Sequence, residues 1–284
     1  MSQLAGWIRH SGQCARFDLR QSMITIDIDP VIVGLGHFAL RWYGLILAGS
    51  IGLGAWIAAA EARRKGILST DFKDAVFWVV LAGLVGARLF HVIDHWPHEY
   101  AANPIRTLYL WEGGLAIWGA VAGGLLALAI FARRRGLSLG RMVDIAAPGL
   151  VLAQGFGRLA CVITGDAMGQ PTAGPLGIAY TNPAAMVPEL GVFYSPMPIY
   201  ELLVNLGIFA LLWRLRKLNW PDGALFLVYL SLYSAERFTL AFVSSYRMVA
   251  LGLTQSQLAA LAALAAAIPL GVWTFTRRAR PRRA

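Results

Sequence analysis

The chain has 284 residues, of which 57% are hydrophobic and only 14% are charged. A soluble domain usually carries roughly 25% charged residues, and several apolar runs here approach the ~20 residues that a spanning helix needs. The formal charge of +10 does not indicate nucleic acid, because the basic residues cluster in short loops, a pattern that sets membrane topology. We therefore predict an all-α polytopic membrane protein with about seven transmembrane helices, and we exclude a soluble or nucleic-acid-binding protein.

The two ends of the chain differ from its apolar middle. Residues 1–22 are polar and lack the apolar run of a secretory signal peptide. We expect them to be a disordered N-terminal extension, or a start-site artefact with Met23 as the initiator. Residues 23–37 alternate weakly and contain Pro30, which predicts a short surface lead-in. We place the transmembrane domain at 23–276 and a basic cytoplasmic tail at 277–284.

Polar or basic connections separate the apolar stretches of the middle. We predict spans at 38–60, 74–95, 114–132, 142–164, 198–213, 223–243 and 255–275. The polar loop 97–112 follows the second span, and the longest connection, 165–197, is rich in Gly and Pro. Loops of that length in compact proteins tend to be functional. We expect this one to be either a mobile lid or a static cap over a site.

The distribution of basic residues predicts the orientation. Sixteen of the 25 Lys and Arg residues fall in the connections after the odd-numbered spans and in the C-terminal tail, against six on the opposite side. Because cytoplasmic loops carry the excess of Lys and Arg, we expect the N-terminus outside and the C-terminus in the cytoplasm. The 165–197 loop then faces the outer side.

The segment Gln154–Thr172 carries the most informative residue, Arg158, near the end of the fourth span. An arginine near membrane depth costs about 2.5–3.5 kcal/mol on insertion scales, so it usually faces a polar cavity or an anionic partner. A guanidinium fork holding a phosphate would explain it; the alternative is an arginine that snorkels to the interface. We expect Cys161 to be a small buried thiol, and Asp166 to be a turn residue or a polar partner of the site.

A second arginine, Arg237, lies in the sixth span beside Glu236 and one turn from Tyr233. It either pairs structurally with Glu236 or Asp144, or it lines an electropositive cavity that opens to the outer leaflet. A phospholipid headgroup is the obvious anion for such a cavity. In the second span, Arg88 and His91 share one helix face and form either a polar lining or an interfacial pair.

From Met23 onward the chain resembles the prolipoprotein diacylglyceryl transferase family. The family pattern GRxGNFxNGExxGxxT resembles Gly157–Thr172, GRLACVITGDAMGQPT. Further matches follow in one order along the chain: Asp29–Pro30, Arg41–Gly44, Gly86–Arg88, Gly113–Leu115, Tyr200–Glu201, Tyr233 with Arg237, and Gly252–Gln257.

The resemblance implies transfer of a diacylglyceryl group from phosphatidylglycerol to the lipobox cysteine of a prolipoprotein, the first step of bacterial lipoprotein maturation. It implies a multi-pass protein of the bacterial plasma (inner) membrane, with membrane lipids as further partners and no nucleic acid. We expect no metal or other cofactor, because no His, Cys or carboxylate spacing suggests a metal. The residues assigned as catalytic are Arg158, Arg237, Tyr43 and Asp166, and those assigned to substrate binding are Arg158, Gly169, Tyr233, Trp118, Arg88 and Glu201.

The chain departs from the family pattern at several positions. Trp118 stands where the family often has histidine, and an indole cannot accept a proton. We expect Trp118 to shape the lipid cavity, and the general base to be Asp166, Glu201, Glu236 or water. The departures also leave open a catalytically weakened homologue that binds or transports phospholipid. At the remaining departures, Cys161 and Thr164 stand where the family has asparagines, and Asp166 stands where it has the longer glutamate. Ser195 stands where the family has a histidine, and Ala241 where it has an acidic residue.

Overall fold

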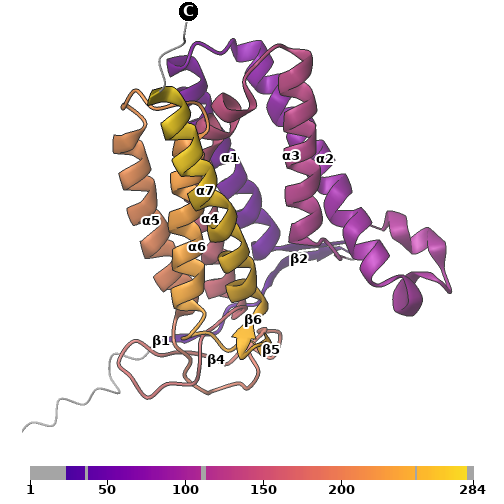
Figure 1. The fold of residues 1–284 in the computed structure, drawn as a ribbon. Coiled ribbons are helices and arrows are strands. Elements are labelled where there is room, and N and C mark those ends of the chain that lie inside the picture. The colour runs from indigo at the N-terminus through magenta and orange to yellow at the C-terminus, as the bar shows by residue number, and fades with distance from the viewer. Residues whose placement is uncertain (1–23, 36–37, 110–112, 247, 280–284) are drawn as a thin grey trace, which may run out of the picture.

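The computed structural model describes residues 24–35, 38–109, 113–246 and 248–279. The predicted N-terminal extension 1–22 lies outside these residues, as does most of the basic tail. Seven long helices correspond one to one with the seven predicted spans (Figure 1): α1 (Trp42–Arg64), α2 (Ser69–Asp94), α3 (Ile117–Arg134), α4 (Leu139–Thr164), α5 (Met197–Leu215), α6 (Ala224–Leu240) and α7 (Gln255–Ala279).

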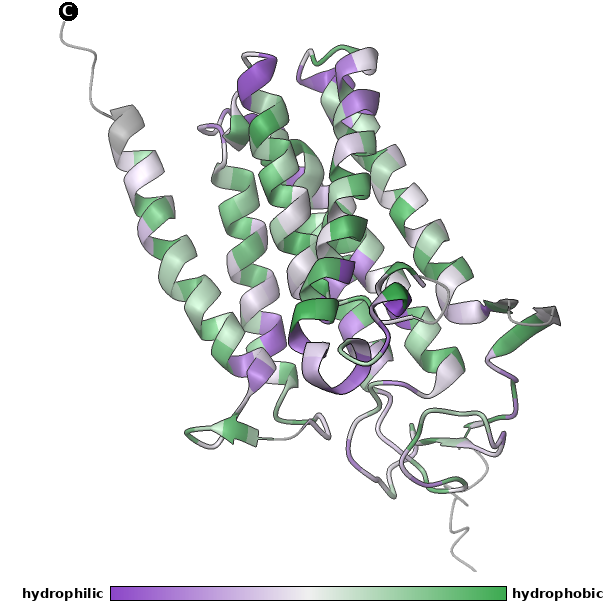
Figure 2. Cartoon of the chain, turned by 90° about the vertical axis from the view of Figure 1, so that its right-hand side faces the viewer, coloured by the Kyte–Doolittle hydropathy of each residue, from purple (hydrophilic) through white to green (hydrophobic). Residues whose placement is uncertain are grey.

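Six of the described helices are long and apolar enough to cross a membrane, and α6, with 17 residues, lies at the lower end of the spanning range. Hydrophobic residues cover the helices along most of their length, and hydrophilic residues gather toward their ends (Figure 2). Many large apolar side chains are exposed on the helix surfaces, among them Trp56, Phe77 and Leu126. Such a surface suits lipid as solvent, so the all-α polytopic membrane fold is confirmed.

Glycine governs how closely the helices approach one another. A Cβ atom added at Gly119 of α3 would collide with the carbonyl oxygen of Gly86 on α2, and one at Gly86 would collide with that of Gly119. A Cβ atom at Gly54 of α1 would lie 2.7 Å from the carbonyl oxygen of Gly149 on α4. Small residues at helix crossings permit such backbone contact in membranes. The glycines of the second and third spans therefore serve close packing rather than a gap.

The structure adds short strands that the sequence reading did not predict. Strands β2 (Val31–Leu35) and β3 (Phe38–Arg41) form an antiparallel pair, and β5 (Met248–Ala250) pairs with β6 (Leu253–Thr254). The first span therefore begins at Trp42 rather than at residue 38, because Phe38–Arg41 is used as a strand. The 97–112 loop contains two short helical turns, η2 (Trp96–Tyr100) and η3 (Pro104–Leu108).

The 165–197 loop is a folded cap with a hydrophobic cluster of its own. Strand β1 (Ile24–Ile26) pairs in parallel with β4 (Ile178–Tyr180) inside this loop, and Met168, Ile178, Tyr180 and Tyr194 are buried together. The hydroxyl of Tyr180 donates to the carbonyl oxygen of Val162, 2.5 Å away, and burial raises the pKa of Tyr180, so it remains a donor. These contacts favour a static cap over a mobile lid.

The cap and the strands β1, β4, β5 and β6 lie at one end of the bundle, opposite the end where α7 finishes (Figure 1). The basic connections between α1 and α2, α3 and α4, and α5 and α6 lie at that other end. The arrangement agrees with the predicted sidedness, and which end faces the cytoplasm stays a prediction.

Candidate active site

Three helices bring the two key arginines to one carboxylate. Arg158 of α4 forms an ion pair from its Nε atom with Oε2 of Glu201 on α5, and Arg237 of α6 forms one from Nη1 with Oε1 of the same carboxylate. Glu201 is 1% exposed. We name Arg158, Glu201 and Arg237 the Arg–Glu–Arg cluster. All three residues are predicted from the sequence, but their convergence is not.

Local packing explains why the three side chains meet. Gly155, one turn before Arg158, lets α4 approach α5 so closely that an added Cβ would lie 3.1 Å from Cβ of Asn205. Asn205 follows Glu201 by one turn and donates to its carbonyl oxygen at 2.8 Å. On the other side, the hydroxyl of Tyr229 on α6 donates to Oε1 of Gln154 on α4 at 2.9 Å. Arg237 lies two turns after Tyr229, near the end of α6 rather than deep within the span.

The end of α4 is defined close to the cluster. Gly165 adopts a positive φ of 77° and terminates the helix after Thr164. The chain then turns into the cap less than two turns beyond Arg158. The loop residue Asp166 is thereby kept within electrostatic reach of Tyr43 and Cys161.

The guanidinium groups keep donors that the cluster does not use. Among the described residues, Arg158 forms an ion pair with Glu201 through Nε, and its Nη1 makes a long contact of 4.0 Å with the sulfur of Cys161. Arg237 uses Nη1 for Glu201. A guanidinium carries five N–H donors, so both arginines retain donors for a further anion.

Three tyrosine side chains surround these charges. Tyr233 and Tyr246 interact electrostatically with both arginines, and Tyr43 interacts with Arg158 and Asp166. Tyr233 is one turn from Arg237, as predicted from spacing. Tyr246 was not predicted, and its only sequence signal is its position in the polar segment that follows α6.

A second buried carboxyl group adjoins the cluster. Glu236 is 5% exposed, and neither of its oxygens has a hydrogen-bond partner among the described residues. It interacts electrostatically with Glu201, Arg237 and Arg158. The structural pairing of Arg237 with Glu236 or Asp144 was the wrong alternative, because Arg237 pairs with Glu201.

Asp144 belongs to the opposite end of α4. Its carboxylate accepts from Lys65 Nζ at 3.3 Å and from the backbone N–H groups of Gly223 and Phe226, each at 2.9 Å. It therefore fastens α6 to α4 at the start of both helices. Snorkelling of Arg158 is likewise not supported, because its guanidinium is turned toward Glu201.

The remaining predicted site residues fall into distinct environments. Gly169 is packed tightly: an added Cβ would lie 2.9 Å from Cβ of Ser195 and 3.0 Å from the carbonyl oxygen of Val243. Its N–H donates to the carbonyl oxygen of Ser195 at 2.9 Å. Gly169 thus packs against the last residues of the cap, before α5, and against the segment after α6. Cys161 is buried, as predicted, whereas Trp118 at the start of α3 is 48% exposed.

Arg88 is engaged by the backbone and not by the cluster. Its Nε, Nη1 and Nη2 atoms donate to five carbonyl oxygens, those of Arg106, Thr107, Tyr109, Gly113 and Gly114, at 2.6–3.2 Å. The five bonds match the five donors of a guanidinium. No donor is left for a headgroup, so the contacts give Arg88 a role in holding the loop before α3.

Comparisons with known proteins identify the family of the chain. The family model described as prolipoprotein diacylglyceryl transferase matches residues 30–273. A phosphatidylglycerol–prolipoprotein diacylglyceryl transferase from Dehalococcoides mccartyi is 35% identical over 257 residues, covering 90% of this chain and 97% of that protein. Proteins of the same name from Lactobacillus acidophilus and Bacillus cereus are each 34% identical, over 90% and 89% of this chain and 92% and 93% of their own lengths. With a family model that matches most of its length and relatives at 34–35% identity over about nine-tenths of it, the chain belongs to the prolipoprotein diacylglyceryl transferase family.

Proposed function

We propose that this chain transfers a diacylglyceryl group from phosphatidylglycerol to the cysteine thiol of a prolipoprotein lipobox, and that the Arg–Glu–Arg cluster binds the phosphate. The relatives' names give the reaction and both substrates. The observation that carries the site assignment is the convergence of Arg158 and Arg237 on Glu201. Membership of a family of transferases does not favour the phospholipid-binding or transport alternative.

In the proposed reaction the cysteine sulfur attacks the glyceryl carbon that is bonded to the phosphate oxygen. A C–S thioether bond forms, the C–O bond breaks with its electron pair on oxygen, and glycerol phosphate leaves. Negative charge grows on the phosphate as the bond breaks. Fixed guanidinium groups in a site that excludes water stabilise such charge more strongly than donors in water do.

Glu201 gives the arginines this fixed geometry before substrate arrives. Without a counter-charge, two buried cations would be costly to desolvate and would repel each other. Because Glu201 engages one nitrogen of each guanidinium, the other donors stay in place for phosphate oxygens. Glu201 is therefore a positioning residue in this proposal, and a poor proton acceptor, since its protonation would leave both arginines without a counter-charge.

The proton of the thiol needs another acceptor, and we assign it to Glu236. A buried acceptor without a hydrogen bond costs about 1–3 kcal/mol, and both oxygens of Glu236 are in that state among the described residues. Such a carboxylate offers a site for a substrate proton beside the two arginines. The hydroxyl groups of Tyr43 on α1 and Tyr233 on α6 donate hydrogen bonds toward the substrate, and Asp166 serves as a polar partner near Tyr43.

Both substrates then reach the cluster from the outer leaflet of the bacterial plasma membrane. This orientation follows from the excess of basic residues at the end of the bundle opposite the cap. The cap covers the cluster end from outside, so we expect phosphatidylglycerol and the lipobox segment to enter laterally between helices. Trp118, exposed at the start of α3, would contact lipid chains there.

The test is transfer of labelled diacylglyceryl from phosphatidylglycerol to a lipobox peptide by the purified protein. We expect Arg158→Ala to abolish transfer, and Arg237→Ala nearly to do so, with little rescue by lysine, because a point charge lacks the bidentate fork. Glu236→Gln, nearly the same size, should lower kcat by about 10²–10⁴-fold if it removes the base. Glu189→Gln, an exposed acid in the cap, is the matched control.

Two results would contradict the proposal. A folded Arg158→Ala protein that retained most activity would refute the phosphate role of the cluster. A wild-type protein that bound phosphatidylglycerol and yet transferred nothing to the peptide would favour the non-catalytic alternative.

A further inference from the structure

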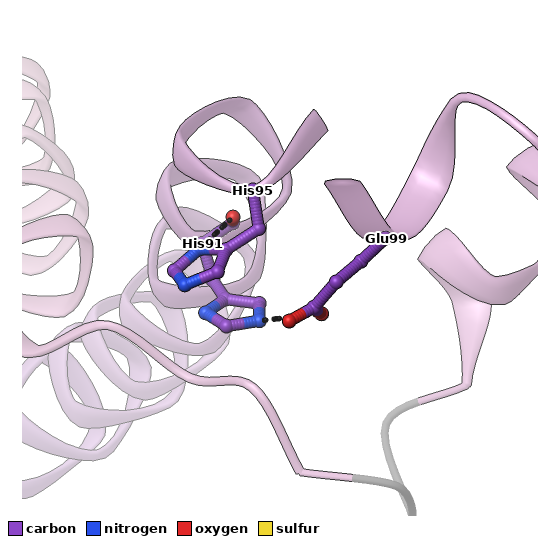
Figure 3. A group of neighbouring side chains, drawn as sticks. All are labelled: His91, His95 and Glu99. Carbon is purple, nitrogen blue, oxygen red and sulfur yellow. Dashed lines mark hydrogen bonds and ion pairs between the residues drawn. The ribbon is translucent and has the colours of Figure 1, made fainter. Parts of the chain in front are cut away.

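The end of α2 carries a group of metal-binding side chains outside the proposed active site. His91 and His95 lie one turn apart near the end of α2, and Glu99 lies one further turn along, in η2 (Figure 3). One ligand atom from each of the three lies within 4.8 Å of the other two. Nε2 of His91 is 3.7 Å from Oε2 of Glu99, and the imidazole rings of His91 and His95 stack with centroids 4.2 Å apart.

We propose that His91, His95 and Glu99 bind a divalent transition-metal ion, with Zn²⁺ the favoured ion. Imidazole selects zinc and its neighbours over Mg²⁺ and Ca²⁺, which prefer oxygen ligands. Two histidines and one carboxylate, with water in the fourth position, are a known zinc donor set. The spacing His-x3-His-x3-Glu was missed in the sequence because His91 was considered only with Arg88.

The geometry needs only small movements to close on an ion. Zinc binds imidazole nitrogen and carboxylate oxygen at about 2.0–2.2 Å, so its ligand atoms lie closer together than they do in this structure. The side chains of His95 and Glu99 are 40% and 47% exposed, which leaves them room to rotate inward. His91 is more enclosed, since an added Cβ on Gly114 would lie 2.6 Å from its Nε2 atom, and it forms the fixed side of the site.

The second imidazole is already oriented by hydrogen bonding. Nδ1 of His95 donates to the carbonyl oxygen of His91 at 3.2 Å and lies 3.4 Å from Oδ2 of Asp94. Such a bond fixes the tautomer and leaves Nε2 free to bind metal, as outer partners commonly do for ligating histidines. It also identifies Nε2 as the atom of His95 that would approach the ion.

The charges near the group are balanced for a cation. Arg88, one turn before His91, keeps its positive charge, which the five carbonyl oxygens that accept from it offset in part. Glu99 and Asp94 supply two negative charges, next to His91 and His95 respectively. Bound metal would fasten η2 to α2 and so brace the loop that Arg88 holds.

The experiment uses the full-length protein, purified without a histidine tag and stripped with a chelator. Zn²⁺ is titrated in competition with a fluorescent zinc chelator, and Co²⁺ is used as a spectroscopic probe of the coordination geometry. We expect about one tightly bound ion, with intense visible absorption from tetrahedral Co²⁺. His91→Ala and His95→Ala should each weaken Zn²⁺ binding tenfold or more, and Glu99→Gln should weaken it less.

His98→Ala is the matched control, because His98 lies in η2 between His95 and Glu99 but outside the three-residue group. It should leave the affinity unchanged. Zn²⁺ should also slow amide hydrogen exchange at Glu99 and Ala101, whose N–H groups bond to the carbonyl oxygens of His95 and Trp96. Circular dichroism verifies that each variant folds.

The proposal is overturned if the folded double variant His91→Ala/His95→Ala binds Zn²⁺ as the wild type does, or if His98→Ala loses binding equally. Failure of the stripped wild type to bind Zn²⁺ more tightly than the double variant also overturns it, and leaves the three residues as an ion pair and a ring stack only. None of these readouts depends on transferase activity, so the proposal stands or falls separately from the proposed reaction.

Discussion

Replacing Glu201 by glutamine tests the physical basis of the Arg–Glu–Arg cluster. The substitution keeps size and shape but removes the charge that faces both guanidinium groups. At an effective dielectric of about 20, two unit charges about 4 Å apart interact by about 4 kcal/mol. Removal of one partner from a buried ion pair costs about 3–5 kcal/mol, because a buried charge is left uncompensated. Glu201 is 1% exposed and serves two arginines, so we expect destabilisation at the upper end of that range.

The assay is heat-induced unfolding in mild detergent, followed by tryptophan fluorescence, with Glu189→Gln as the control for loss of an exposed carboxylate. The double variant Glu201→Gln/Arg237→Gln should recover part of the stability, because only one guanidinium then remains unpaired. An anion that binds the folded state stabilises it. Glycerol phosphate should therefore raise the unfolding temperature of Glu201→Gln more than that of the wild type, because in the variant it faces two guanidinium groups that have lost their carboxylate.

The expected order of stability is therefore wild type, double variant, then Glu201→Gln. Unfolding of Glu201→Gln at the wild-type temperature, without added response to glycerol phosphate, would refute both the buried pairing and the phosphate-binding role.

Four further predictions address other parts of the molecule. Trp118→His should leave transfer within a few-fold of wild type, because Trp118 is exposed at the start of α3, where we propose that it contacts lipid chains. A rise from undetectable to robust transfer would show that the natural chain is impaired at this position. Cysteines placed singly in the cap should react with membrane-impermeant reagents added outside intact cells, whereas labelling only from the cytoplasm would reverse the orientation and move the proposed site to the inner leaflet. Gly119→Val should destabilise the protein by about 1–3 kcal/mol or more, because the added side chain would overpack against Gly86 and Phe90. Gly207→Val is the control and should not destabilise the protein, because the space around Gly207 is open. Equal unfolding temperatures for the two variants would count against backbone contact between α2 and α3. In a background with Cys14 and Cys161 replaced and activity verified, a bifunctional thiol reagent can join Gln170→Cys to Val243→Cys, because the backbones of these residues are hydrogen-bonded at 3.2 Å. This crosslink should not stop turnover if the cap is static. Reversible loss of turnover on crosslinking would instead show that the cap acts as a mobile lid.

Composition and segment length alone predicted the membrane class and the seven helices. A helix in lipid must satisfy its own backbone hydrogen bonds and needs about 20 apolar residues. The membrane class and the helices can therefore be predicted without knowledge of any tertiary contact. Helix ends were predictable to within a few residues where glycine or basic residues mark them, as at Gly165. The strand Phe38–Arg41 was not, because its apolar residues read equally well as the start of a span.

The pairing inside the bundle was decided by tertiary structure. In a soluble helix the apolar face is the buried one, but most of the surface of α5 is apolar, and its buried polar residues are Glu201 and Asn205, one turn apart. These two residues indicate an inward face, but they do not show which helix that face meets. Glu201 meets Arg158 and Arg237 only because Gly155 lets α4 approach α5 and Asp144 anchors α6 to α4. Arg88 illustrates the same limit, since an arginine in a span predicts a polar partner but does not distinguish a lipid phosphate from five carbonyl oxygens of a neighbouring loop. Sequence determined which residues need a partner, and packing between helices far apart in the chain determined which partner each one found.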